Sequence, residues 1–136
     1  MNIRLVLVAL PLVLAGCGTT GFGKGAAGGA NVPATAISAM GGGLVSGSVG
    51  AGLSASEKRS ALEAEYKALE YTPGGQPVIW RGGQSGRYGE VVAAQPYRVG
   101  SQDCRQYKHT VYAGGAGTSA RGTACRNADG SWSPLT

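Results

Sequence analysis

Cys17 is the residue whose surroundings most clearly predict chemistry. It closes the motif Leu14-Ala15-Gly16-Cys17, at the end of an apolar run that begins at Leu5. In the lipoprotein-signal pattern that this motif resembles, small residues fit the signal peptidase and a diacylglycerol alkylates the cysteine thiol before cleavage. The run is well short of the roughly 20 residues that cross a bilayer, which favours a targeting segment over a membrane anchor. We therefore expect lipidation at Cys17; an ordinary secretory cleavage beside an unrelated cysteine is the alternative.

The two remaining cysteines are expected to form a disulfide. An exported chain with three cysteines has an odd thiol unless one of them is otherwise used, and lipidation of Cys17 leaves Cys104 and Cys125 as a pair. An oxidising compartment would allow this pair to close. A zinc site is disfavoured because these cysteines and the single histidine, His109, lack the close spacings of zinc ligands. We expect no metal and no cofactor.

Catalysis finds little support in the sequence. Neither Asp103 nor any serine stands at a spacing from His109 that marks a nucleophile and its base. There is no G-x-S-x-G motif, and Glu90 has no obvious acidic partner for glycosidase chemistry. We expect no enzymatic activity, and we expect His109 to be a partly buried strand residue with satisfied ring nitrogens.

The net charge is +5, from 12 Lys or Arg against 7 Asp or Glu. The basic residues beyond Tyr71 are scattered rather than clustered, which is typical of a solvated sheet face. A mild positive excess suits an anionic lipid or cell-wall surface, and we expect no nucleic acid among the partners.

The sequence predicts three parts: a signal peptide over residues 1–16, a Gly-rich segment over 17–53, and a helix plus β domain over 54–136. Within the Gly-rich segment, small residues recur at every fourth position, at Ala39, Gly43, Gly47 and Ala51. On a helix they would form a zipper face for close packing in a membrane and for self-association. A flexible tether is the alternative, because each glycine costs a helix interior about 1 kcal/mol relative to alanine. The residues leave both interpretations open.

We expect the rest of the chain to form an α+β domain that positions the cysteine pair and His109. Ser54 and Glu57 fit a capping box, which predicts an amphipathic helix from there to about Glu70. Short β-prone runs follow over residues 77–81, 87–94, 103–113 and 116–126, with a last strand around Trp132. We expect them to form a small antiparallel sheet.

The longest predicted hairpin has a register that can be counted. Gly114-Gly115 suits a tight turn, and pairing Ala113 with Ala116 brings Cys104 directly opposite Cys125. Opposed residues in antiparallel strands lie close enough for a disulfide. Alternation places His109 on the face that meets the helix and the two cysteines on the more polar face, unless a bulge intervenes.

Several motifs together resemble one known family. Beside the lipoprotein motif and the small-residue segment they are Gly75-Gln76-Pro77-Val78-Ile79-Trp80, Asp103-Cys104-Arg105-Gln106-Tyr107, Gly122-Thr123-Ala124-Cys125-Arg126 and Asp129-Gly130-Ser131-Trp132. The chain is similar to the rickettsial seventeen-kilodalton surface antigen family of outer-membrane lipoproteins. The resemblance implies a lipid-anchored glycine-zipper envelope protein with a small β-rich domain and no established enzymatic activity. Members often carry a Gly-rich region long enough for two membrane passes, whereas only one fits here.

The favoured hypothesis is a structural protein that organises the envelope or presents a surface antigen, held in the outer membrane by its N-terminal lipid, such as palmitate. The alternative is a lipid-tethered binding module that captures a protein or cell-wall ligand, for example as a hydrolase inhibitor. Zero or two membrane passes would leave the domain in the periplasm, and one pass would place it on the cell surface. The sequence does not decide between these topologies.

Overall fold

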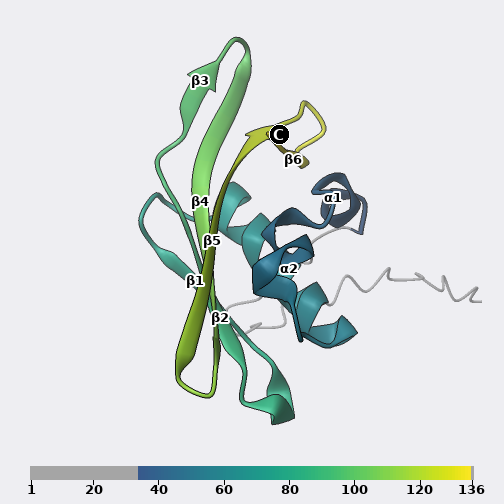
Figure 1. Cartoon of the computed structure of the whole chain (residues 1–136). Helices are drawn as coiled ribbons and strands as arrows, with labels where there is room; N and C mark the ends of the chain where they lie inside the picture. Colours follow the sequence, from purple (N-terminus) through teal and green to yellow (C-terminus); the bar gives the residue numbers. More distant parts are fainter. Residues whose placement is uncertain (1–33, 136) are drawn as a thin grey trace, which may run out of the picture.

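The structure, a computed structural model, describes residues 34–135 and has the expected α+β fold. Its helices are α1 (Ala34–Ala39) and α2 (Ala55–Glu70), with short 3-10 helices η1 (Gly43–Ser46), η2 (Ser48–Gly50) and η3 (Gly83–Ser85). Its strands are β1 (Pro77–Arg81), β2 (Tyr88–Ala93), β3 (Tyr97–Val99), β4 (Gln102–Ala113), β5 (Ala116–Arg126) and β6 (Trp132–Pro134). The strands form one antiparallel sheet in the order β1-β2-β4-β5-β6, and β3 pairs with β4. Figure 1 shows α1 and α2 gathered on one side of this sheet.

Helix α2 begins as the sequence predicts. The Ser54 hydroxyl accepts from the Glu57 backbone N–H at 3.2 Å, and a Glu57 carboxylate oxygen accepts from the Ser54 N–H at 3.2 Å. These reciprocal bonds form the expected capping box and satisfy backbone donors that a helix start leaves free. Three alanines on its buried face allow the helix to approach the sheet closely: Ala61, Ala64 and Ala68.

The long β4–β5 hairpin has the predicted register. Ala113 pairs with Ala116, and Cys104 pairs with Cys125. Gly114 and Gly115 form the turn with φ angles of 63° and 91°, which only glycine adopts readily. Because the pairing runs without a bulge between these ends, alternation holds along the hairpin and His109 faces the helix, fully buried.

Strand β3 is an element that the sequence analysis missed. Tyr97, Arg98 and Val99 are all exposed, so their side chains lack the alternation that marks a half-buried strand. They pair with Cys104, Asp103 and Gln102 at the start of β4. A tight turn at Gly100, with φ of 61°, brings the two strands together.

The Gly-rich segment does not form the single zipper helix that was one of its two predicted structures. Helix α1 ends at Ala39, and Gly41, Gly42 and Gly43 adopt φ angles of 59°, 88° and 53°. Consecutive positive φ angles end a right-handed helix, because that helix needs negative φ throughout. The chain continues as η1 and η2, so the small residues at every fourth position do not form one face. No helix within residues 34–135 is long and apolar enough to cross a membrane.

From Ala34 onward this segment is not a flexible tether either, because its large apolar side chains are buried in the core of the domain. Met40, Val45, Val49 and Leu53 are all buried and pack with α2 and the sheet. The folded unit therefore starts before Ser54, where the sequence analysis placed its beginning. At Gly50 an added Cβ would collide with the Val45 carbonyl oxygen, so glycine permits this tight packing.

Candidate functional site

The centre of the domain is a chain of three hydrogen-bonded polar side chains. The Trp80 indole Nε1–H of β1 donates to His109 Nε2 on β4 at 2.8 Å. The other ring nitrogen of His109 lies 2.7 Å from Glu65 Oε1 on α2. His109 and Glu65 are fully buried, and Trp80 is 5% exposed. One polar connection thus crosses the core from the edge strand to the helix.

The hydrogen-bond donors in this three-residue network determine which ring nitrogen of His109 carries the proton. An indole N–H can only donate, so His109 Nε2 must accept and the ring proton sits on Nδ1, facing the Glu65 carboxylate. The second carboxylate oxygen of Glu65 accepts from the Leu44 backbone N–H at 3.1 Å. Burial raises the pKa of Glu65, and the hydrogen bonds from His109 and Leu44 oppose that rise. The network therefore connects α2 with η1 as well as with two strands.

This geometry indicates a structural role for His109. Its ring is sealed from solvent, and both of its nitrogens are occupied, so a substrate has no access to either nitrogen in this conformation. Within residues 34–135 no three His, Cys, Asp or Glu side chains gather in a way that could hold a metal. Satisfied ring nitrogens were predicted for His109, but burial is complete rather than partial. Its partner Glu65 was not predicted.

Two further ionic contacts bind the ends of α2. At its start, Arg87 donates two hydrogen bonds of 2.8 Å to Glu57, which hold the pKa of that carboxyl well below its usual range. At its end, Arg126 Nε and Nη2 contact Glu70 at 2.9 and 3.0 Å, and Trp132 Nε1–H donates to Glu70 at 2.7 Å. Burial opposes ionisation of Glu70, but these hydrogen bonds outweigh it and lower the pKa of Glu70.

Arg105 closes the C-terminal end of α2. Its Nη1 donates to the backbone carbonyls of Ala68, Leu69 and Thr72 at 3.0, 2.7 and 2.9 Å. Its Nε donates to the Ala94 carbonyl at 2.8 Å. The last carbonyls of a helix have no partner within the helix and favour a nearby cation, so this side chain satisfies them from the sheet.

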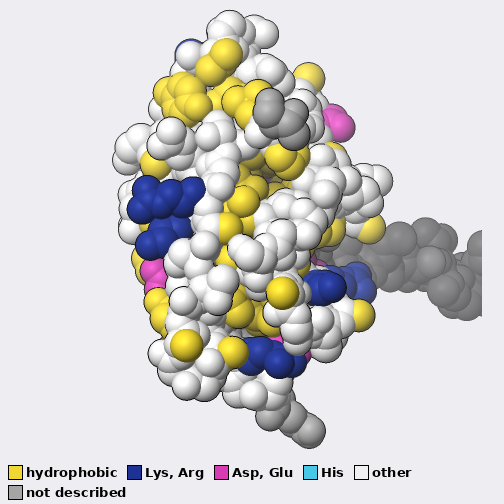
Figure 2. Space-filling model, in the orientation of Figure 1, with side chains coloured by type: hydrophobic (Ala, Val, Ile, Leu, Met, Phe, Trp, Pro, Cys, Tyr) yellow, Lys and Arg dark blue, Asp and Glu magenta, His cyan; other side chains and the backbone are white. Residues whose placement is uncertain are grey.

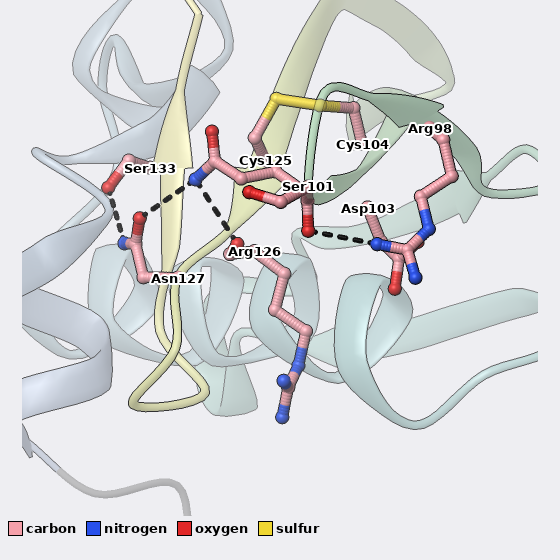
Figure 3. The surroundings of a disulfide bond; sticks show 9 residues. Arg98, Ser101, Asp103, Cys104, Cys125, Arg126, Asn127 and Ser133 are labelled. Atoms are coloured by element: carbon pink, nitrogen blue, oxygen red, sulfur yellow. Dashed lines mark hydrogen bonds and ion pairs between the residues drawn. A yellow bond between two sulfur atoms is a disulfide. The ribbon is translucent and has the colours of Figure 1, made fainter.

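The disulfide lies at the opposite end of the β4–β5 hairpin from its turn. Cys104 and Cys125 are bonded, as the sequence predicts, and both side chains are buried. Figure 3 shows the bridge above the loop that joins β5 to β6, where Asn127 donates to the Ser133 hydroxyl at 2.8 Å. The bridge therefore fixes the end of the sheet to which the short strands β3 and β6 attach.

The sheet face away from the helices is open and partly basic. It carries a groove whose lining includes Glu90, Lys108, Thr110, Tyr112 and Arg121. Lys108 and Arg121 stand directly opposite each other on β4 and β5, and no ion pair joins either to a carboxylate of residues 34–135. Figure 2 shows Lys and Arg side chains gathered on this side of the sheet. Like charges in opposed positions repel each other, so this face favours an anionic neighbour.

The remaining predicted site residues have different outcomes. Cys17 lies outside the described residues. Of the zipper positions, Ala39 ends α1, Gly43 and Gly47 border η1, and Ala51 follows η2. A Cβ on Gly43 would collide with the Glu65 carboxylate, so this glycine serves packing inside the domain.

Comparison with known proteins identifies the sheet as the shared part. Residues 67–133, from the last turn of α2 into β6, match the family described as 17 kDa outer membrane surface antigen. A relative named 17 kDa surface antigen from Rickettsia bellii is 40% identical over 85 residues, which are 62% of this chain and 54% of the relative. One of the same name from Rickettsia japonica is 41% identical over 83 residues, 60% of this chain and 52% of the relative. The chain spans about half the length of these relatives, and no solved structure matches it.

Proposed function

This chain belongs, through residues 67–133, to the 17 kDa outer membrane surface antigen family. On that basis we propose that it is an outer-membrane lipoprotein, a surface antigen with a structural role in the envelope. The family match over the sheet carries this proposal. The described domain supports a structural role because its single histidine is sealed in the core. Its most polar interior contacts join the helix to the sheet, which fits such a role.

The membrane attachment in this proposal is the lipid on Cys17. Residues 34–53 pack on the domain, so they are unavailable as a zipper span while the domain keeps this fold. A Cys17→Ser variant tests the attachment, with metabolic palmitate labelling as the readout. We expect the label and the membrane-fraction signal to disappear together in this variant. A variant that stays in the outer-membrane fraction would contradict attachment through the lipid.

The side of the membrane is tested by proteinase digestion of intact and permeabilised cells, followed by an antibody against the C-terminal domain. Loss of the antibody signal in intact cells is expected for a surface antigen and would require an export route other than a helix through residues 34–53. Protection in intact cells, with digestion after permeabilisation, would place the domain in the periplasm and contradict surface presentation.

A second candidate function is a tethered binding module for an anionic cell-wall ligand, favoured by the opposed Lys108 and Arg121 on the open sheet face. Co-sedimentation with purified peptidoglycan would test it. We expect the double variant Lys108→Gln/Arg121→Gln to lose binding, whereas Lys58→Gln/Arg59→Gln on α2 removes the same charge from the other side and should retain it. Equal binding by both variants would show that the position of the lost charges does not matter, and would contradict a binding site on the open sheet face.

A further inference from the structure

Strand β5 has a long edge without a partner strand. On one side it pairs with β4 from Ala116 to Cys125, but on the other side β6 covers only Ala124–Arg126. The next contact on that side is the Leu135 N–H, which donates to the Thr123 carbonyl at 2.8 Å. Residues 116–122 have no strand beside them within the described part of the chain. In Figure 1 this half of β5 lies at the front of the sheet.

The register shows which backbone groups point out of this edge. In antiparallel strands, closely approaching pairs do not hydrogen-bond to each other, and their N–H and C=O groups point away from the partner. Cys104 and Cys125 are such a pair, with Cα atoms 4.0 Å apart. Every second residue of β5 from Cys125 therefore points its backbone groups outward, as the Leu135 contact at Thr123 confirms. The free residues of this set are Gly117, Ser119 and Arg121.

This edge lacks the features that usually prevent strand pairing. Proteins protect edges with proline, with bulges or with several charged side chains. The sequence from 116 to 122 contains neither proline nor bulge, and Arg121 is its single charge. By contrast β1, at the other edge of the sheet, begins with Pro77 and is five residues long.

We propose that β5 of a second copy of this chain pairs with this edge, antiparallel and two-fold symmetric about Ser119. In this register Ser119 lies opposite Ser119 of the second copy, and Arg121 lies opposite Gly117. All three outward residues of each copy then exchange both backbone hydrogen bonds with the other copy. The two sheets become one continuous sheet across the dimer. This inference does not rest on the lipid anchor or on the proposed cellular role.

The outer face of the sheet favours a second copy over an unrelated strand. Four paired residues form one row across it: Arg81, Tyr88, Tyr112 and Gly117. The two tyrosine rings stack with centroids 4.9 Å apart, and the Tyr112 ring lies over Gly117, 3.0 Å from where a Cβ would stand. The residue opposite Gly117 in the dimer is Arg121 of the second copy, which continues this row.

This position supplies what Arg121 lacks within its own chain. Its cross-strand neighbour there is the like-charged Lys108. Beside Tyr112 of the second copy, its guanidinium would meet an aromatic ring, which attracts a cation. Gly117 has no side chain to separate the two groups, so the Tyr112 ring that covers it faces the position of Arg121. An acidic peptide from another protein could also neutralise Arg121, but it has no requirement for glycine at residue 117.

The test uses charges at the two-fold axis. Ser119→Lys and Ser119→Glu each place like charges opposite each other in the dimer, whereas a mixture of the two variants places opposite charges there. Sedimentation equilibrium on the chain from residue 17 with Cys17→Ser, at low salt and up to about 1 mM, gives the dissociation constants. We expect each variant alone to dimerise about fivefold more weakly than the parent, and the mixture to regain parental affinity or exceed it.

Gln106→Lys and Gln106→Glu are the matched controls. Gln106 is exposed on the same face but lies on β4, inside the sheet, so its variants should dimerise like the parent, alone and mixed. Circular dichroism should show the parental fold for all four variants. The proposal is overturned if the parent remains monomeric at the highest concentration, if the Ser119 variants dimerise like the parent, or if mixing them restores nothing.

Discussion

Removal of the disulfide should weaken the domain by an amount that follows from the loop it closes. The bridge joins residues separated by 21 positions. The chain-entropy relation gives about 3 kcal/mol of stabilisation for a loop of this size, because the bridge restricts the unfolded chain. For a domain of about 100 residues, that loss should lower the melting temperature by roughly 12 to 20 °C. The folded hairpin keeps its ladder without the bridge, so we expect the variant to fold.

The assay compares urea unfolding of the oxidised chain, of the chain with its disulfide reduced, and of Cys104→Ala/Cys125→Ala. The alanine variant matters because serines in these buried positions would add the cost of burying hydroxyl groups. We expect the reduced and alanine forms to unfold at similar, lower urea concentrations. A difference from the oxidised form of less than about 1 kcal/mol would refute the loop argument, and would mean that the unfolded chain already keeps the hairpin ends close.

Three further predictions concern the helix and the Gly-rich segment. Gly50→Ala should destabilise the domain by about 1 to 3 kcal/mol in thermal unfolding, because the added Cβ collides with Val45. Gly47→Ala has ordinary space around its Cβ and should be nearly neutral. Equal effects of the two variants would contradict the packing of this segment. Glu65→Leu should cost about 1 to 3 kcal/mol in urea unfolding for each of the two backbone or ring donors that it leaves without an acceptor, the His109 Nδ1–H and the Leu44 N–H. Glu65→Gln keeps one acceptor oxygen at this place and should cost less; equal losses would contradict a stabilising contact with these donors. The lowered pKa of Glu57 means that its contact with Arg87 stabilises the fold above pH 4.5, its ordinary value, and that this contribution is lost as the pH falls toward the folded-state pKa. The stability difference between the parent and Glu57→Gln should therefore shrink as the pH is lowered from 4.5 to 2, and a constant difference would contradict the contact.

The parts of the fold that the sequence predicts well depend on local signals. The capping box at Ser54 and Glu57 places the start of α2, and the Gly114-Gly115 turn together with two cysteines fixes one hairpin register. Each of these signals lies within a few residues or follows from counting along paired strands. Local geometry is therefore enough to predict them.

The polar contacts of the helix could not be predicted in the same way. Glu57, Glu65 and Glu70 find partners 30, 44 and 56 residues further along the chain. No periodicity links such distant positions, and a glutamate on a helix usually faces solvent. The neighbours of Glu65 held one usable signal, because it lies between Ala61 and Leu69 at helical spacing, on the face that becomes buried.

The Gly-rich segment was mispredicted because its spacing of small residues was given more weight than its large ones. Met40, Val45, Val49 and Leu53 recur at intervals of four or five residues, and all of them are buried. Three consecutive glycines at residues 41–43 allow the chain to turn between them. On one helix Val45, Val49 and Leu53 would share a face and Met40 would lie on the opposite one, whereas the turns direct all four side chains into one core.

The two tryptophans give this protein built-in optical probes for two positions along α2, its middle and its last turn. Trp80 donates to His109, which contacts Glu65 in the middle of α2, and Trp132 donates to Glu70 at its last turn. Each indole therefore senses a different segment of the same helix. Trp80→Phe and Trp132→Phe variants would leave one emitter each, so fluorescence could distinguish fraying of the helix end from loss of the whole helix. Neither probe requires a dye or a label.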